Sequence, residues 1–239
     1  MPTQDLVREA RELWEELAGA ARSFTPGGTV SVIVSPESRL CPSGWVGVVA
    51  LAGSAIVTVP SEKTAATVRT AFSGLPVEAL VDAASVRDVL PVARTLGPAT
   101  LAYASPEGFR PVTGPSPVER LPAGHPALRA LEAAAGQEDS AEASLDEITS
   151  PAFVVREGGR VVAAAGYEGW PRRTAHISVL TAPQARGRGL ARTAASAAVA
   201  HALAAGLLPQ WRARPPASRR VAAALGFEEL GAQLSLELA

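Results

Sequence analysis

The sequence predicts an α/β protein with a mixed α+β sheet. β-forming residues at Ile177, Val179 and Thr181 alternate with other residues, as in a strand, and Pro183 then stops the pattern because it has no N–H to donate. An Ala-rich stretch follows without a breaker until Gly206, which predicts a long helix. Hydrophobic residues make up 47% of the 239 residues, so the chain can bury a core as one large domain or two small ones.

Charge and composition exclude several classes of partner. The formal net charge is −1, which gives no electrostatic argument for binding nucleic acid or a membrane surface. No apolar run approaches the roughly 20 residues that cross a bilayer, and the N-terminus lacks the basic start and apolar core of a signal peptide. We therefore expect a cytoplasmic protein without nucleic-acid or membrane partners. Its oligomeric state, including a homodimer, stays open.

Residues 1–105 predict a smaller α+β domain. Ser61 is a favourable N-cap for a helix, and Gly53-Ser54 joins two strands as a hairpin. This half contains no glycine-arginine loop. The expected helices span residues 5–22, 62–72 and about 84–96, and the expected strands span residues 29–35, 45–52, 55–60 and 100–104.

Residues 106–124 predict a linker and a domain boundary, because they hold five prolines and three glycines. Residues 125–239 then form the second domain. Its expected helices span residues 127–135, about 139–145, the stretch after Gly189 and 219–225, and its expected strands span residues 153–156, 160–167, 173–181, 207–213 and 232–238.

A glycine-arginine loop lies between the strand that ends near residue 181 and the long helix. Gly187 and Gly189 permit a tight turn and a close approach of a ligand to the main chain. The helix that begins here presents unpaired N–H groups and the positive end of its dipole, and Arg186 and Arg188 add charge. These features predict an anion-binding site. A dinucleotide fingerprint fits poorly, because Arg192 occupies its third glycine position, and no Gly-Lys-Ser/Thr follows.

The loop resembles the acyl-CoA loop of the GNAT superfamily of N-acetyltransferases, whose pattern is Arg/Gln-x-x-Gly-x-Gly/Ala. Arg186, Gly189 and Ala191 match this pattern and keep the family's spacing from the strand and the proline. Gln184, Gly187 and Gly189 satisfy the same pattern two residues earlier. We prefer the later register because of the spacing.

A second resemblance to the same family lies downstream. Ser218-x-x-Val221-x-x-x-Leu225-Gly226-Phe227 is similar to the family's Ser-x-x-(apolar)-x-x-x-Leu-Gly-Phe, and it follows the preceding strand at the expected distance. Gly226 is also the expected C-cap of this short helix. The two motifs cover roughly the C-terminal half of the chain and specify a fold and a cofactor, but they do not identify an acceptor.

The resemblance implies an N-acyltransferase that moves an acetyl group from acetyl-CoA to a primary amine of a small molecule or a protein by direct attack. The pantetheine would pair with the strand edge near Val179, which requires the next strand to separate, and Pro209 in that strand is consistent with a disrupted ladder. The pyrophosphate would lie on the loop. The residues expected to bind acetyl-CoA are Val179, Leu180, Thr181, Arg186, Gly187, Arg188, Gly189, Leu190, Ala191 and Ser218; Ser218 would contact the thiol end or cap its helix.

Proton-transfer groups that are common in this family are replaced in the chain. Pro215 stands where many members have Asn, Ala222 where many have a Tyr general acid, and Ala175 where some have a Glu base. The remaining candidates for a base are Glu147 and His176, together with Glu142 and Asp146 on the same acidic stretch as Glu147. A solvated acidic face and a hydrogen-bonded strand histidine are the simpler explanations of these residues. A catalytically silent acyl-CoA-binding or interaction protein is therefore the alternative.

Other chemistry is weakly represented in the sequence. The three histidines, Cys41 and scattered carboxylates show no metal-ligand spacing, so no metal is expected. Tyr167 and Glu168 end a hairpin strand near the expected mouth of the site, where either would orient an acceptor or, more simply, lie at the rim. Trp170 is expected to pack in the core or at the rim. The N-terminal half is left open between a degenerate GNAT-like copy and a capping or acceptor-binding domain.

Overall fold

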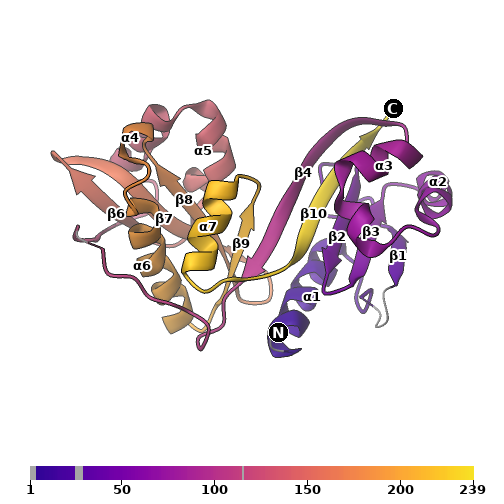
Figure 1. The fold of residues 1–239 in the computed structure, drawn as a ribbon, viewed down its shortest axis with the longest axis horizontal. Coiled ribbons are helices and arrows are strands. Elements are labelled where there is room, and N and C mark those ends of the chain that lie inside the picture. Colours follow the sequence, from indigo (N-terminus) through magenta and orange to yellow (C-terminus); the bar gives the residue numbers. More distant parts are fainter. Residues whose placement is uncertain (1–3, 25–28, 115) are drawn as a thin grey trace. The chain divides into compact units, whose positions relative to one another are not determined.

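The computed structural model describes residues 4–24, 29–114 and 116–239, and the chain divides into two compact units (Figure 1). Unit 1 comprises Met1–Leu101 together with Glu229–Ala239, and unit 2 comprises Ala102–Glu228. Each unit contains helices packed on strands, which confirms the predicted mixed α/β fold.

Unit 1 is built on strands in the order β1-β3-β2-β10-β4. Strand β1 is parallel to β3, whereas β2 is antiparallel to both β3 and β10. The elements are α1 (Gln4–Ala18), β1 (Val30–Val34), β2 (Val46–Leu51), β3 (Ser54–Val59), α2 (Glu62–Phe72), η1 (Val77–Val81), α3 (Ala83–Val89), β4 (Val92–Tyr103) and β10 (Glu228–Leu238).

The central strands of unit 1 are covered on both faces. Every residue of β2 and β3 is buried, as expected when helices pack on each side of a sheet. Val48 and Val57 belong to one apolar cluster with Val68 and Phe72 of α2. Helix α1 buries Trp14 among other apolar residues. Hydrophobic burial from two sides therefore holds this unit together.

The structure confirms the helix that Ser61 was expected to cap and corrects the one that follows it. Helix α2 spans Glu62–Phe72, and the Ser61 side chain accepts the N–H of Thr64 at 3.2 Å. The expected helix over residues 84–96 is wrong beyond Val89, because β4 begins at Val92. Leu90 has extended dihedral angles, as sterics favour for the residue before Pro91.

Unit 2 carries strands in the order β9-β8-β7-β6-β5, with the end of β4 beside β9. The β6–β7 and β7–β8 pairs are antiparallel, and β8 and β9 are parallel. The elements are β5 (Glu119–Leu121), α4 (Pro126–Ala135), α5 (Gln137–Ala143), η2 (Leu145–Glu147), β6 (Ala152–Glu157), β7 (Arg160–Trp170), β8 (Thr174–Thr181), η3 (Pro183–Ala185), α6 (Leu190–Ala204), β9 (Leu208–Ala213) and α7 (Pro216–Ala224).

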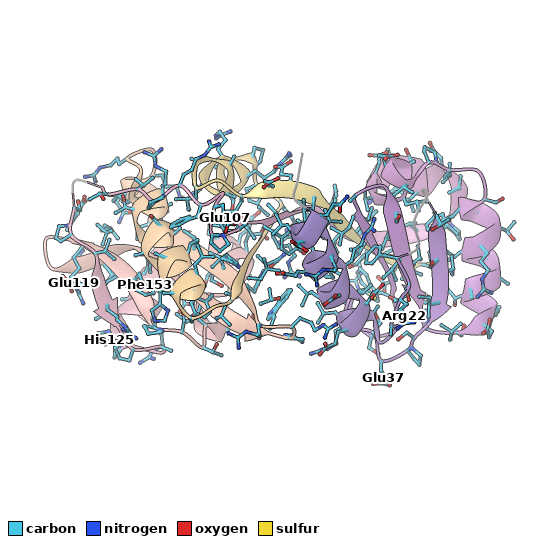
Figure 2. The ribbon with its side chains drawn as sticks, turned by 90° about the horizontal axis from the view of Figure 1, so that it is seen from below. Arg22, Glu37, Glu107, Glu119, His125 and Phe153 are labelled. Carbon is cyan, nitrogen blue, oxygen red and sulfur yellow. The ribbon has the colours of Figure 1, made fainter. Side chains whose placement is uncertain are left out.

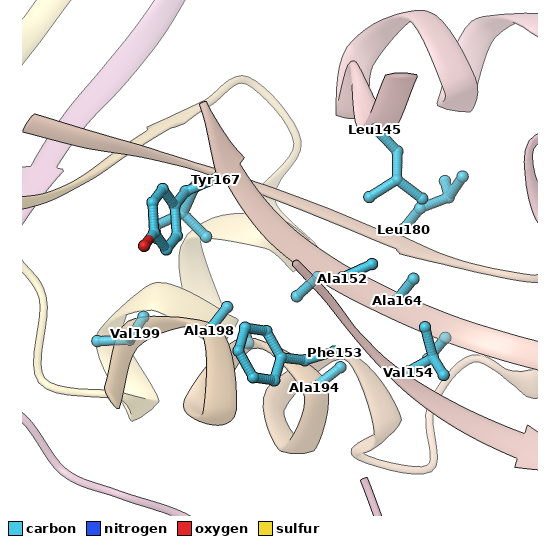
Figure 3. Close-up of a cluster of buried hydrophobic side chains, with 14 of the residues drawn as sticks. Leu145, Ala152, Phe153, Val154, Ala164, Tyr167, Leu180, Ala194, Ala198 and Val199 are labelled. Atoms are coloured by element: carbon cyan, nitrogen blue, oxygen red, sulfur yellow. The ribbon is translucent and has the colours of Figure 1, made fainter. Parts of the chain in front are cut away.

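The apolar residues of unit 2 pack on both faces of the strands, against α6 on one face and against η2 on the other. Phe153 and Tyr167 lie on the side of α6, where both rings contact His201, and Leu145 and Leu180 lie on the other side of the strands (Figure 3). Figure 2 also shows Phe153 beside α6. Small buried residues along α6 let this helix approach the strands closely, as the Ala-rich sequence predicts.

The compact units divide the chain differently from the expected boundary at 106–124. The strand β5 lies inside that stretch, and β10 pairs with β2 in unit 1, with Leu234 opposite Val48. A folding boundary at the proline-rich stretch stays a prediction. Among the helices that the structure describes, none combines the length and the apolar character needed to cross a membrane.

We expect the Ser61→Ala variant to lower the free energy of unfolding by about 1 kcal/mol, because it removes the side-chain acceptor for the N–H of Thr64. Chemical denaturation of the purified protein measures this loss. Ser61→Asp keeps an acceptor at the same position and should retain the stability of the wild type. An equal loss in both variants would contradict a capping role for Ser61.

Candidate functional site

The parallel strands β8 and β9 separate after a short paired segment. Their register runs from Thr174–Leu208 to His176–Gln210 and then ends. On the other edge of β8 the antiparallel register with β7 continues as far as Thr181. The result is a fork that opens between β8 and β9 beyond residue 176. We call this opening the β8/β9 fork.

The backbone of β8 presents groups without a strand partner to the fork. The N–H of Ala182 donates to the carbonyl of Val162 at 2.9 Å, so even-numbered residues of this strand face β7. Odd-numbered residues therefore direct their N–H and C=O groups to the opposite edge, where the N–H of Leu208 donates to the carbonyl of Arg173 at 2.9 Å. Beyond the last pair, Val179 and Thr181 have no strand partner on that edge within the described residues.

Pro209 does not open the fork in the way the sequence suggested. Its carbonyl accepts the N–H of Ala104 at 3.2 Å, on the β4 side of β9. Since the neighbouring Leu208 faces β8, the missing N–H of Pro209 also lies on the β4 side. The expected disruption of the β8–β9 ladder by this proline is therefore wrong, and the strands separate one pair later.

The glycine-arginine loop connects β8 to α6 next to the fork. Gly187 has φ 76° and Gly189 has φ 79°, in the left-handed region that favours glycine. The first bond of the helix joins the N–H of Thr193 to the carbonyl of Gly189 at 3.1 Å. The N–H groups from Gly187 to Ala191 make no hydrogen bond to any described residue. Five consecutive donors and the positive end of the helix dipole thus converge here.

The two loop arginines are paired with carboxylates. The Arg186 guanidinium contacts Asp139 at 2.5 Å, and Arg188 forms a two-pronged pair with Glu157 at 2.8 and 2.5 Å. These side chains are about half exposed, at 48% for Arg186 and 52% for Arg188. Ion pairs at this exposure contribute little to stability, so an incoming anion exchanges partners with them at low cost.

Ser218 makes a different contact from the two that the sequence suggested. Its hydroxyl accepts the indole N–H of Trp211 at 2.9 Å, whereas the N-cap of α7 is Pro215. Capping by Ser218 is therefore wrong, and binding to a thiol stays a prediction. Ala222 and Ala175 are buried, which leaves no polar group where the family often has a Tyr or a Glu.

His176 is buried at the point where the fork opens. Its Nδ1 lies 2.5 Å from Oε1 of Gln210, and its ring stacks on Trp170 with the centroids 4.1 Å apart. Burial lowers the pKa of His176 to about 3, and the charge of Arg212 acts in the same direction. The imidazole is therefore neutral near pH 7 and a weak base, and its role as a base stays a prediction.

Glu147 lies at the end of η2 with an exposed side chain. Its carboxylate makes no hydrogen bond or ion pair to another described residue, and its charge raises the pKa of Arg212. The structure thus brings Glu147 within electrostatic reach of the β9 side of the fork. Its role as a base also stays a prediction.

Sequence reasoning missed that Glu168, Trp170, Gln210 and Arg212 surround His176. Glu168 lies directly opposite His176 in the β7–β8 register, and Gln210 lies opposite it in the β8–β9 register. Trp170 and Arg212 are two residues further along and share that face. The period-2 alternation of β7 and β9 was visible in the sequence, but the register that joins them to His176 was not.

Metal-binding groups are not gathered at this site or elsewhere in the described ranges. Residues 4–24, 29–114 and 116–239 contain no group of three or more His, Cys, Asp or Glu placed to hold a metal ion. That no metal is needed stays a prediction from the sequence.

Comparison with known proteins identifies a domain within the chain. Residues 150–232, which include both strands of the fork and the loop, match the family model described as GNAT acetyltransferase. This part of the chain is therefore a GNAT acetyltransferase domain. The resemblance of the two sequence motifs is thereby confirmed. Among curated proteins, no sequence matches this chain.

Solved structures extend the comparison to the whole chain. A GCN5-related N-acetyltransferase-like protein from Streptococcus suis matches over 100% of both chains, with 16% identity and a TM-score of 0.52, and so shares the fold. A GNAT-family protein from Novosphingobium aromaticivorans has 27% identity and a TM-score of 0.49, over 61% of this chain and 65% of its own. The chain thus matches somewhat less than two thirds of that protein.

A Salmonella typhimurium protein that was solved with acetyl-CoA as its cofactor also matches. It is 24% identical, covers 36% of this chain and 62% of its own length, and has a TM-score of 0.32.

We expect the free energy of unfolding to fall more steeply with decreasing pH in the wild type than in His176→Gln, starting at about pH 6.5. Unfolded histidine takes up a proton near pH 6.5, whereas folded His176 takes one up only near pH 3, so the unfolded chain binds more protons between these values. The difference in slope approaches about 1.4 kcal/mol per pH unit.

Chemical denaturation of both proteins between pH 7 and pH 4 measures this difference in slope. Both proteins contain the same carboxylates, so the contributions of these groups to the two slopes cancel. An imidazole NMR titration gives a second readout, in which the His176 ring should stay neutral at pH 5. Equal slopes, together with an ordinary titration of that ring, would contradict the buried neutral state.

Proposed function

We propose that this GNAT protein transfers an acetyl group from acetyl-CoA to a primary amine. The observation that carries the proposal is the placement of two complementary surfaces side by side. An open strand edge at Val179 and Thr181 leads directly into a loop with five unpaired N–H groups. A strand edge suits a ligand with amide groups, and a helix N-terminus suits a phosphate.

The residues at the loop fit an acyl-CoA. The hydroxyl of Thr181 is buried and has no hydrogen-bond partner among the described residues, so a polar ligand would satisfy it. The loop also has room for a ligand, because a Cβ built on Gly187 meets no atom within 4 Å. The main chain is therefore open to a bulky anion at this turn.

Each expected cofactor residue has a role in this proposal. Val179, Leu180 and Thr181 offer the open strand edge, and Ser218 lies on α7 with its hydroxyl already accepting from Trp211. The pyrophosphate would be held by the side chains of Arg186 and Arg188 and by the N–H groups of the loop, contributed by Gly187, Arg188, Gly189, Leu190 and Ala191.

The chemistry requires an acyl donor, a donor for the developing oxyanion and a proton acceptor. Acetyl-CoA supplies the thioester, whose C–S bond breaks as the amine nitrogen bonds to the carbonyl carbon. The N–H of Val179, which points into the fork, is placed to stabilise negative charge on the carbonyl oxygen. The amine loses one proton, and we assign its acceptance to Glu147, since a histidine with a pKa of about 3 holds a proton weakly.

A catalytically silent acyl-CoA-binding protein is the second candidate function. The observation that favours it is the pair of buried alanines, Ala175 and Ala222, at positions where many family members carry a proton-transfer group. This candidate predicts tight binding of acetyl-CoA without release of free thiol in the presence of any amine. The two functions therefore differ in turnover and agree in cofactor binding.

We expect acetyl-CoA to raise the melting temperature of the wild type but not that of Gly189→Trp. Ligand at 100 times its Kd stabilises the folded state by about 2.7 kcal/mol. A bulky residue at φ 79° distorts the turn that presents the N–H groups. Differential scanning fluorimetry with and without acetyl-CoA measures both effects.

Gly124→Trp is the matched control for this experiment. Gly124 also has a positive φ, of 71°, and a Cβ there meets no atom within 4 Å, so the backbone strain is similar away from the loop. This variant should keep the shift with acetyl-CoA. Absence of a shift in the wild type would overturn the proposed cofactor, and thiol release that persists unchanged in Glu147→Gln would overturn the assigned base.

A further inference from the structure

Trp211 and Ser218 form a hydrogen-bonded pair on the β9 side of the β8/β9 fork. Trp211 directly follows Gln210, which is the last residue of β9 that pairs with β8. The indole N–H of Trp211 donates to the hydroxyl of Ser218 on α7 at 2.9 Å. Because Trp211 is the first residue of β9 beyond the ladder, the pair fixes a hydroxyl of α7 close to the point where the two strands separate.

Packing holds the indole of Trp211 in place. Trp211 is only 3% exposed, and its ring meets the edge of Phe227 with the ring centroids 5.3 Å apart. Both residues belong to one apolar cluster with Ala222 of α7. Successive side chains of a strand point to opposite faces, so Trp211 lies on the face opposite to Gln210. The direction of the indole N–H, and with it the position of the Ser218 oxygen, is therefore set by the core.

The hydroxyl of Ser218 keeps its proton for a second partner. An indole N–H can only donate, so the contact with Trp211 occupies a lone pair of the hydroxyl oxygen. A serine hydroxyl also carries one donor, and in the part of the chain that the structure describes no acceptor takes that proton. Ser218 is partly exposed, so a ligand or water can reach it. The pair thus offers a hydroxyl donor whose oxygen is fixed.

The composition of α7 makes this donor distinctive. Ser218 carries the single hydroxyl of the helix, whose other residues are proline, alanine, arginine and valine. Ala222 lies four residues later on the same face and is buried, so it provides no polar group one turn further along. A ligand that lies against this face of α7 therefore meets one hydroxyl, that of Ser218.

The position of the pair along the fork matches the reacting end of the proposed donor. Continuing the register by one residue beyond His176–Gln210 sets Trp211 level with Ile177. Val179, whose N–H is assigned to the carbonyl oxygen of the acetyl group, follows two residues later, a rise of about 7 Å along the strand. A thioester in the fork would thus lie between the Val179 N–H on β8 and the hydroxyl held from β9.

We propose that the hydroxyl of Ser218 donates a hydrogen bond to the sulfur of CoA, and that Trp211 is the positioning residue that orients this hydroxyl. The inference rests on the proposed acetyl transfer and deepens it by naming the group that stabilises the leaving thiolate. As the amine nitrogen bonds to the carbonyl carbon, the C–S bond breaks and its electron pair stays on sulfur. The amine proton goes to Glu147, and Ser218 keeps its own proton. A hydrogen bond to the charged form of a thiol lowers its pKa, so departure as the thiolate becomes easier.

The test compares the binding of CoA with that of desulfo-CoA, which differs only in lacking the sulfur. Calorimetry gives the Kd of each ligand from about pH 7 to about pH 10, a range that brackets the ionisation of a thiol near pH 8.5. In the wild type, the preference for CoA over desulfo-CoA should rise about fivefold or more over this range, because one charge-assisted hydrogen bond lowers the pKa of the bound thiol by about one. Protein groups that titrate affect both ligands and cancel in the ratio.

Three variants separate the two roles. Ser218→Ala should abolish the rise in the preference for CoA, whereas Ser218→Thr retains a hydroxyl and should keep it. Trp211→Phe retains an aromatic ring without the N–H, and the rise should fall to about threefold or less, since the hydroxyl is no longer oriented. A purely structural effect of any variant weakens both ligands alike and leaves the ratio unchanged. Trp45→Phe and Ser61→Ala, which lie in unit 1, are the matched controls and should behave as the wild type.

Each outcome bears on a different part of the inference. A constant ratio in the wild type, or a rise that Ser218→Ala retains, would overturn the hydrogen bond to sulfur while leaving cofactor binding intact. A full rise in Trp211→Phe would overturn the positioning role of the indole. Failure of the wild type to bind either ligand would instead overturn the proposed function. The experiment needs no acceptor, so its result applies equally to a protein without turnover.

Discussion

The early end of the β8–β9 ladder is the constraint on which the rest of the site depends. Parallel neighbours normally share hydrogen bonds along their length, yet these two strands pair only as far as His176 and Gln210. The backbone groups of Val179 and Thr181 on that edge are left without a strand partner. The carbonyl of Thr181 accepts the Nε–H of Arg186 at 3.4 Å, and the other groups are costly to leave unpaired unless water or a ligand satisfies them. The antiparallel ladder with β7 and the packing of α6 hold β8 in place despite this loss. The fork is therefore a preformed edge that is held open by the packing on its other sides.

The loop after β8 extends the same arrangement. Left-handed angles at Gly187 and Gly189 turn the chain within a few residues, so the unpaired N–H groups lie at the end of the open edge. Small residues on the buried face of α6, such as Ala194 and Ala198, allow the helix axis to lie close to the strands. Backbone donors that are fixed by packing need no reorganisation when an anion binds, which is the reason helix N-termini serve this purpose.

The sequence predicted the parts of this site that depend on local chemistry. Proline after a strand, two glycines and an Ala-rich run specify strand, turn and helix without distant contacts, and the Ser61 cap was predictable for the same reason. Features that depend on strand pairing between distant segments could not be predicted from the sequence. The membership of β10 in unit 1 depends on its register with β2, and the gathering of Trp170 and Arg212 around His176 depends on two registers at once. Residues 92–96 form a strand although the sequence predicts a helix there, because apolar spacing over a short stretch fits both patterns.

Three arginines near the site illustrate how environment decides what the same side chain does. Arg186 and Arg188 are about half exposed and paired with carboxylates, so they add a diffuse positive field that any phosphate-bearing ligand experiences. The exposed side chain of Arg212 instead lies with its guanidinium 5.7 Å from the ring centroid of Trp170. In the proposed function, the loop binds the phosphates of the cofactor through its arginines and backbone donors, whereas a guanidinium over an aromatic ring is held by a cation–π contact.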